Sequence, residues 1–123
     1  MKILDNKNKI GLEELKKMAK KMFGQLVKAV VDVEKEVMVI DGELHTDEER
    51  LLLEQNSRQK NLWGINLYPE LKGKEWIEFD SMINLKPHQG NLSRGINDKK
   101  TREKIVKIVR QLIKNEISAP KSV

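Results

Sequence analysis

Residues suited to acid–base or ligand chemistry gather between residues 76 and 86, where alternation predicts a strand with one apolar and one polar face. The apolar face comprises Ile77, Phe79, Ser81, Ile83 and Leu85, and the polar face comprises Trp76, Glu78, Asp80, Met82 and Asn84. Asn66 and Tyr68, on a neighbouring predicted strand, extend the polar face. Two carboxylates at this spacing repel each other, and such pairs serve as general acids or bases. Pairing of each carboxylate with a lysine on an open sheet face is the simpler interpretation.

The loop before the last predicted helix carries groups suited to an anion. Asn91, Ser93 and Arg94 lie between two glycines and lead toward the helix start. Backbone N–H groups at a helix start, the helix dipole and an arginine together favour a phosphate or a carboxylate. Asp98 argues against this, because its carboxylate occupies the position that an incoming anion needs. The alternative is a plain structural loop in which Arg94 pairs with an acidic neighbour such as Asp80.

A third candidate is a row of possible metal ligands. Glu43, His45, Asp47 and Glu49 alternate along the chain, so on an extended strand they would share one face. Carboxylates and neutral imidazole are common ligands of divalent metals. His88 is the only other histidine and could join this row only through tertiary folding. A solvated face beside a turn explains the row as well, and we expect no cofactor.

The charge of the chain invites a nucleic-acid interpretation. Lysine and arginine number 24 against 19 acidic residues, which gives a net charge of +5 and a pI near 9.4. The basic faces of residues 16–21 and 99–114 could contact phosphates, with Trp76 stacking on a base, since Trp63 alternates with core residues. Both signs of charge are mixed through most of the chain, however, and this mixture is typical of a solvated surface.

Two segments show the three-and-four spacing of amphipathic helices. The first apolar stripe consists of Leu12, Leu15, Met18, Ala19, Met22 and Phe23, and Gly24 follows as a helix end. The second consists of Ile105, Val106, Ile108, Val109, Leu112 and Ile113, preceded by Asn97 and Asp98 as candidate N-caps. The sequence therefore predicts an N-terminal and a C-terminal helix.

Strand patterns occupy most of the chain between these helices. Residues 27–33 and 37–40 are rich in β-branched side chains, and the Asp41-Gly42 turn signal follows the second run. Residues 62–68 and 76–86 also predict strands. Residues 46–55 are ambiguous, because Thr46 begins a capping box whereas three consecutive leucines suit a short strand. We favour the strand for this segment.

These patterns predict one α+β domain over residues 1–123, with an antiparallel sheet of four to five strands packed against the two amphipathic helices. Residues 1–9 and 118–123 are expected to be flexible. Cysteine is absent, which excludes disulfides, thiolate metal sites and cysteine nucleophiles. Without a signal sequence or a bilayer-spanning run, we expect a cytoplasmic protein with no membrane partner. An open sheet edge makes a homodimer a further possibility.

Three motifs carry a resemblance to a known family. They are Glu43-Leu44-His45, the run from Leu62 to Pro69 and the run from Ile77 to Asn84, joined by the Asn-x-Ser-Arg core at residues 91–94. The chain resembles domain of unknown function 5674, a family of small prokaryotic proteins, over residues 12–113. The resemblance implies a single domain and carries no assigned activity.

Three functions remain open at this point. The first is a binding or interaction module that holds an anionic ligand or a protein partner on the polar sheet face and the loop that follows it. The second is a small hydrolase or ribonuclease that pairs His45 or His88 with Glu78 or Asp80, while Arg94 stabilises developing charge. The third is nonspecific nucleic-acid binding.

Overall fold

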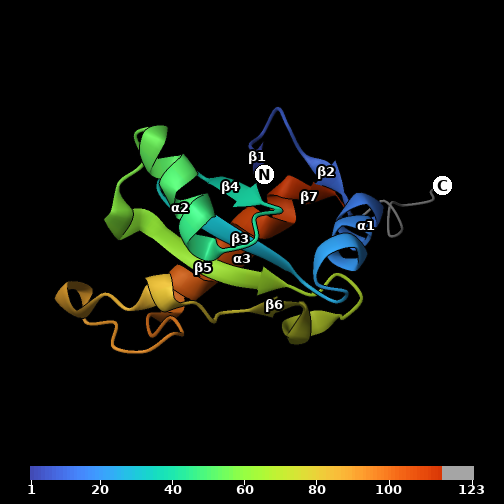
Figure 1. The fold of residues 1–123 in the computed structure, drawn as a ribbon. Coiled ribbons are helices and arrows are strands. Elements are labelled where there is room, and N and C mark those ends of the chain that lie inside the picture. Colours follow the sequence, from blue (N-terminus) through green and yellow to red (C-terminus); the bar gives the residue numbers. More distant parts are fainter. Residues whose placement is uncertain (115–123) are drawn as a thin grey trace.

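The computed structural model describes residues 1–114, and a five-stranded antiparallel sheet forms its centre (Figure 1). In spatial order the strands are β1 (Lys2–Leu4), β4 (Val37–Ile40), β3 (Val27–Asp32), β5 (Leu62–Leu67) and β6 (Ile77–Glu78). A separate parallel pair joins β2 (Ile10–Gly11) to β7 (Ile113–Lys114). The α+β class and the antiparallel sheet are confirmed.

Within residues 1–114, three α-helices cover the sheet, with α1 (Leu12–Met22) and α3 (Lys99–Leu112) on one face and α2 (His45–Glu54) on the other (Figure 1). Leu15 of α1 and Ile105 of α3 pack in the same buried cluster as Ala29 of β3. Leu52 of α2 packs in a second cluster with Val30 of β3. The structure therefore has three layers, and both faces of the central strands are buried.

The two predicted terminal helices are confirmed, and their ends follow from local chemistry. At the end of α1, Gly24 has a φ of +84° and its N–H donates to the Ala19 carbonyl, a conformation that suits glycine. At the start of α3, the Asp98 carboxylate accepts hydrogen bonds from the Thr101 N–H at 3.0 Å and the Thr101 hydroxyl at 2.7 Å. Asp98 is therefore the N-cap.

The strand predicted over residues 46–55 is wrong, because this segment forms α2. Glu48 and Leu52, four residues apart, are the buried residues of the helix, whereas Leu53 is exposed. Three consecutive leucines thus place one side chain against the sheet and direct another to solvent, as helical geometry requires. The helix also adds the third layer, which the sequence did not predict.

The strand predicted over residues 76–86 is also wrong in length, because β6 ends at Glu78. The chain then turns over the sheet, and the Ser81 side chain packs directly on Gly64 of β5. A Cβ at Gly64 would lie 2.6 Å from the Ser81 Cβ, so only glycine fits there. The expected faces also change, since Asn84 is fully buried whereas Leu85 is exposed.

Short 3-10 helices connect the remaining elements. They are η1 (Gln59–Asn61), η2 (Gly73–Trp76), η3 (Met82–Asn84) and η4 (Pro87–Gln89). Near the N-terminus, where we expected flexibility over residues 1–9, β1 pairs with β4 and the Asp5 carboxylate accepts a hydrogen bond from the Asn8 N–H at 2.8 Å. The tail predicted to be flexible at residues 118–123 lies outside the described residues.

Candidate functional site

A row of polar side chains crosses the sheet beneath the start of α2. Lys28 of β3 lies directly opposite Asn66 of β5, and Asn66 lies opposite Glu78 of β6. Opposed residues share a sheet face, so the three side chains project to the same side. Two residues further along β3, Val30 lies opposite Gly64 on the same sheet face, and Val30 belongs to the buried cluster beneath α2. We call the face that carries Lys28, Asn66 and Glu78 the α2 face.

Asn66 and Tyr68 together fix the position of the Glu78 carboxylate. The Asn66 Nδ2 group donates to Glu78 Oε1 at 2.9 Å, and the Tyr68 hydroxyl donates to the same oxygen at 3.0 Å. Loss of hydration, reinforced by the bond to Glu78, raises the pKa of Tyr68, so the phenol remains protonated and donates. Glu78 is therefore held by neutral donors and not by a lysine.

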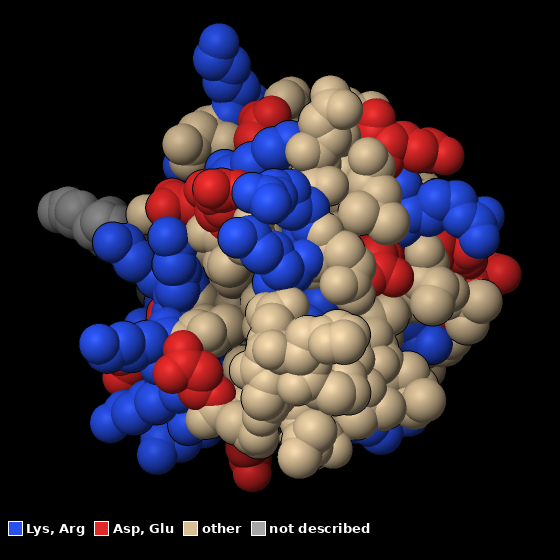
Figure 2. Space-filling view, turned by 90° about the vertical axis from the view of Figure 1, so that its left-hand side faces the viewer, with Lys and Arg blue, Asp and Glu red and all other residues tan. Residues whose placement is uncertain are grey.

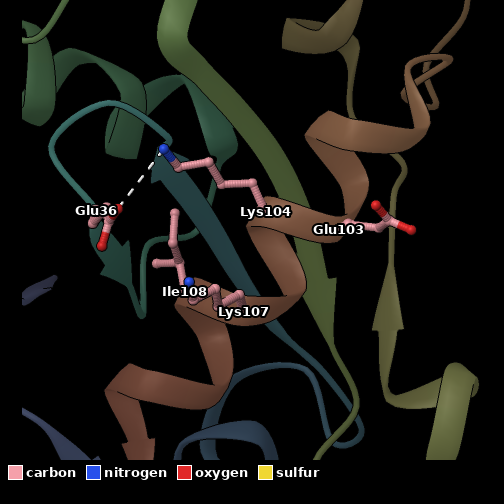
Figure 3. Close-up of a pocket in the computed structure, with 5 residues that line it drawn as sticks. All are labelled: Glu36, Glu103, Lys104, Lys107 and Ile108. Atoms are coloured by element: carbon pink, nitrogen blue, oxygen red, sulfur yellow. Dashed lines mark ion pairs between the residues drawn. The ribbon is translucent and has the colours of Figure 1, made fainter.

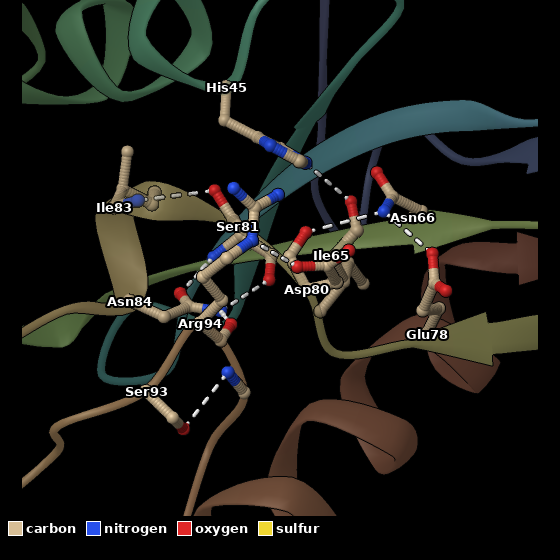
Figure 4. Close-up of polar contacts among 12 residues, drawn as sticks. His45, Ile65, Asn66, Glu78, Asp80, Ser81, Ile83, Asn84, Ser93 and Arg94 are labelled. Carbon is tan, nitrogen blue, oxygen red and sulfur yellow. Dashed lines mark hydrogen bonds and ion pairs between the residues drawn. The ribbon is translucent and has the colours of Figure 1, made fainter.

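Asp80 and Arg94 form a separate pair. Arg94 Nε donates to Asp80 Oδ1 at 2.6 Å, which is the pairing that the structural interpretation of the loop predicted. The Arg94 side chain is 54% exposed and the Asp80 side chain is 43% exposed, so the pair lies at the surface. Because Glu78 and Asp80 have different partners, they do not form the carboxylate couple that the expected strand suggested. Figure 4 shows the two terminal nitrogens of Arg94 pointing toward the ring of His45.

His45 is the first residue of α2, and its ring lies over β5 (Figure 4). Its Nε2 atom is 2.8 Å from the carbonyl oxygen of Ile65. A carbonyl only accepts hydrogen bonds, so Nε2 carries the hydrogen and Nδ1 of the neutral ring keeps its lone pair. Burial lowers the pKa of His45, and the positive charges of Lys28 and Arg94 add to this; together they outweigh the hydrogen bond to Ile65 and the charge of Asp80, which raise it. The imidazole is neutral at pH 7.

This arrangement predicts the titration of His45. The Hε1 resonance of His45, followed by NMR against pH, is expected to have a midpoint below the ordinary 6.5. Arg94→Gln removes one of the positive charges that oppose protonation, so the midpoint in that variant should move upward. A midpoint at or above 6.5 in the wild-type protein would contradict the burial of a neutral ring at this position.

Asn84, a predicted ligand-binding residue, instead stabilises the backbone. Its Oδ1 accepts from the Gly64 N–H at 2.8 Å, and its Nδ2 donates to the Gly64 carbonyl at 3.0 Å and the Arg94 carbonyl at 2.9 Å. The carboxamide thus takes the place of a neighbouring strand where β6 has already ended. It also fixes the backbone from which the Arg94 side chain extends.

Asn91 and Ser93 likewise have their side chains committed to the loop. Asn91 Nδ2 donates to the carbonyls of Asn84 and Gly95, each at 2.7 Å, and Asn91 Oδ1 accepts from the Asn97 N–H at 2.8 Å. Ser93 Oγ accepts from the Gly95 N–H at 3.1 Å. These residues position Arg94, and their polar atoms already have partners within the protein.

Two further candidates fall outside this site. Trp76 is half-buried in η2 and packs against the cluster on the α1 and α3 side of the sheet. His88 is exposed in η4, and none of the hydrogen bonds found among residues 1–114 involves its ring. The structure brings together Asn66, Glu78, Asp80, Arg94 and His45, and it leaves Trp76 and His88 elsewhere.

The predicted metal row does not form. Glu43 precedes α2, and the helix places Asp47 and Glu49 about 200° apart around its axis, so the alternating residues do not share a face. Within residues 1–114, no group of three or more His, Asp or Glu side chains is arranged to hold a metal ion. The physical reason is that residues 45–54 form a helix and not an extended strand.

Sequence reasoning missed two ionisable residues of this region, Lys28 on the α2 face and Glu48 on α2 itself. Lys28 lies within the segment 27–33 that predicts a strand, and it is the one cation of β3. Glu48 is fully buried; its Oε2 accepts from the Gly42 N–H at 2.8 Å, and its Oε1 has no partner among the described residues. Burial raises the pKa of Glu48 to about 9, so this side chain is neutral at pH 7.

Other parts of the surface do not bring functional side chains together in the same way. Figure 3 shows a surface hollow lined by Glu36, Glu103, Lys104, Lys107 and Ile108, where Lys104 pairs with Glu36 at 3.7 Å. Figure 2 shows lysine and arginine side chains interrupted by acidic ones, beside a broad uncharged area. This mixture of charges is typical of a solvated surface. The basic side chains therefore do not form a continuous track on the face in view.

No helix within residues 1–114 has the length and apolar character needed to cross a bilayer. No curated protein and no solved structure shows significant similarity to the chain. One family model does match, over residues 3–112, and it is described as protein of unknown function (DUF5674). The match covers nearly all of the sequence and agrees with the resemblance of the motifs. The chain therefore belongs to the DUF5674 family.

Proposed function

We propose that this protein is a binding module that holds a small anionic ligand on the α2 face, between Arg94 and His45. The observation that carries the proposal is the orientation of Arg94. The Arg94 Nε is held by Asp80, while the two terminal nitrogens of Arg94 point toward His45 and have no acceptor among residues 1–114. A guanidinium fixed at one nitrogen and open at the other two is suited to a carboxylate or a phosphate.

The surrounding charges support an anion at this position. Lys28 adds a second positive charge near His45, and the negative charge that Asp80 contributes there is paired with Arg94. The α2 start has no side-chain cap, because Leu44 occupies the N-cap position, so the N–H groups of His45 and Thr46 are open to an acceptor, whereas that of Asp47 donates to the Leu44 carbonyl. The α3 start, where the sequence suggested an anion, is instead capped by Asp98. The proposed site therefore lies at α2.

We further propose that the protein acts in the cytoplasm of a prokaryotic cell, in keeping with the absence of cysteine and of a bilayer-spanning helix within residues 1–114.

A small molecule suits the compact cluster better than a protein partner does, because most polar groups of the cluster are already paired. If the protein forms a homodimer, one of the two edge strands of the sheet, β1 or β6, is where a second copy would pair.

Arg94→Gln tests the proposal. Glycerol 3-phosphate titrated into the protein by calorimetry is expected to bind the wild type and to bind Arg94→Gln at least about tenfold more weakly, because a charge-assisted pair is lost. Arg110→Gln is the matched control, since Arg110 is exposed on α3, on the opposite side of the sheet. Equal weakening by both substitutions would mean that net charge alone attracts the ligand, and the proposal would fail.

Hydrolysis of a phosphate ester is a second candidate function, favoured by the open lone pair on His45 Nδ1 beside Arg94. RNA would be one such substrate. The appearance of alcohol and inorganic phosphate during the same titration would favour hydrolysis over simple binding. Nonspecific nucleic-acid binding would instead appear as an affinity that falls steeply with salt concentration.

A further inference from the structure

Asn66 carries a buried acceptor with no donor. Its Nδ2 donates to Glu78 Oε1 at 2.9 Å and to the Asp80 carbonyl at 3.3 Å, and these two acceptors determine which end of the carboxamide is nitrogen. The opposite atom, Oδ1, is buried and has no hydrogen-bond partner among the described residues. Asn66 as a whole is only 7% exposed, so solvent does not readily supply the missing donor. A buried acceptor of this kind is expensive to leave unpaired.

The nearest cation does not supply the missing donor. Lys28 lies directly opposite Asn66 in the strand pair, yet its Nζ lies 5.0 Å from the centre of the Phe23 ring. The ammonium group is thus directed along the sheet toward the end of α1. Figure 4 shows the Asn66 oxygen on the same side of the sheet as the His45 ring.

Asn66 and Arg94 are both bonded to Asp80. Asn66 Nδ2 donates to the Asp80 carbonyl, and Arg94 Nε donates to the Asp80 carboxylate. Asp80 thus holds the amide nitrogen of Asn66 and the Nε of Arg94 in the same part of the α2 face. The Arg94 and Asp80 side chains are about half exposed, so this end of the site is accessible from solvent.

From this geometry we propose that the ligand carries a hydroxyl or amine donor close to its anionic group, and that this donor binds Asn66 Oδ1 while Arg94 binds the anion. The inference rests on the proposed function and adds the chemical class of the ligand. Hydroxylated phosphate esters and 2-hydroxy or 2-amino carboxylates share this chemistry. An anion without the neighbouring donor leaves the Asn66 oxygen unpaired.

Matched pairs of probes test the inference. The first pair is glycerol 3-phosphate and propyl phosphate, and the second is lactate and propionate; each pair differs in the neighbouring hydroxyl groups. In the wild-type protein the hydroxylated member of the correct pair is expected to bind about tenfold more tightly. In Asn66→Leu the ratio of the two affinities should fall to about one. Whichever pair shows the difference identifies the anion as phosphate or carboxylate.

An NMR measurement on the wild-type protein covers the case in which Asn66→Leu does not fold. The side-chain amide resonances of Asn66 should shift with the hydroxylated probe and remain in place with its partner. Equal affinity within both pairs, with Arg94→Gln still weakening binding, would overturn this inference and leave the proposed function intact. Binding of no probe at all would overturn both.

Discussion

Asn84→Ala is expected to lower the free energy of unfolding by about 4 kcal/mol, because it removes a fully buried carboxamide whose three partners are all backbone groups. The Gly64 N–H and carbonyl would lose their partner beside Ser81, where packing is too tight for even a Cβ on Gly64. The Arg94 carbonyl would lose its partner as well. Urea denaturation monitored by circular dichroism measures the change.

Asn97→Ala is the matched control for this prediction. Asn97 is exposed, and its side chain makes only a long contact of 3.4 Å to the Gly90 carbonyl, so its removal should change stability by less than about 0.5 kcal/mol. If Asn84→Ala proved as mild as Asn97→Ala, the carboxamide would not be replacing a strand beside Gly64. The proposed positioning of Arg94 would then lose its main support.

Glu48 should make the stability of the protein fall as the pH rises. Its pKa is about 9 in the folded protein against 4.5 in the unfolded chain, so between these values the folded state holds a proton that the unfolded state has released. Stability is therefore greatest below the unfolded pKa and declines as the pH rises toward the folded pKa. The expected slope is about 1.4 kcal/mol per pH unit from about pH 5 to about pH 8.

Glu48→Gln isolates this effect, because glutamine can accept the Gly42 N–H and does not ionise. The free energy of unfolding of the wild type, measured relative to this variant across the pH range, should fall with the slope given above. Glu54→Gln, an exposed position in the same helix, controls for the loss of one negative charge. A wild type and Glu48→Gln with parallel pH profiles would show that Glu48 is ionised at neutral pH.

The elements that the sequence predicted correctly have signals within one short window. The stripes of α1 and α3 repeat at helical spacing, and β3, β4 and β5 are rich in β-branched or apolar residues. Capping by Asp98 and the positive φ of Gly24 are also local, since each depends on the residues immediately beside it. Such features need no knowledge of distant contacts.

The segments predicted wrongly are those in which a distant residue decides the outcome. Glu48 is buried in α2 through a bond to Gly42, and the burial of a carboxyl group is not visible in a hydrophobic pattern. Residues 79–84 leave the sheet because Ser81 and Asn84 pack on Gly64, twenty residues away from Asn84 in the chain. Alternation alone could not distinguish this turn from a continuing strand.

The candidate site was predicted in part for the same reason. Pairing of Arg94 with Asp80 was expected from their types, and Asn66 was placed beside Glu78 from neighbouring strands. The proximity of His45 to Arg94 depends on the helix that the sequence did not predict. Lys28 joins the face only through the register of β3 with β5, which a single strand pattern does not specify.

Mapping of the ligand by ¹H–¹⁵N NMR tests the central claim most directly. Glycerol 3-phosphate added to the wild-type protein should shift the amide resonances of residues 44–46, 65–66, 80–81 and 94–95, with the largest change at Arg94. Shifts confined to the lysine-rich surface of α3, or no shift of the resonances around Arg94 and His45, would contradict the assignment of a binding site to the α2 face.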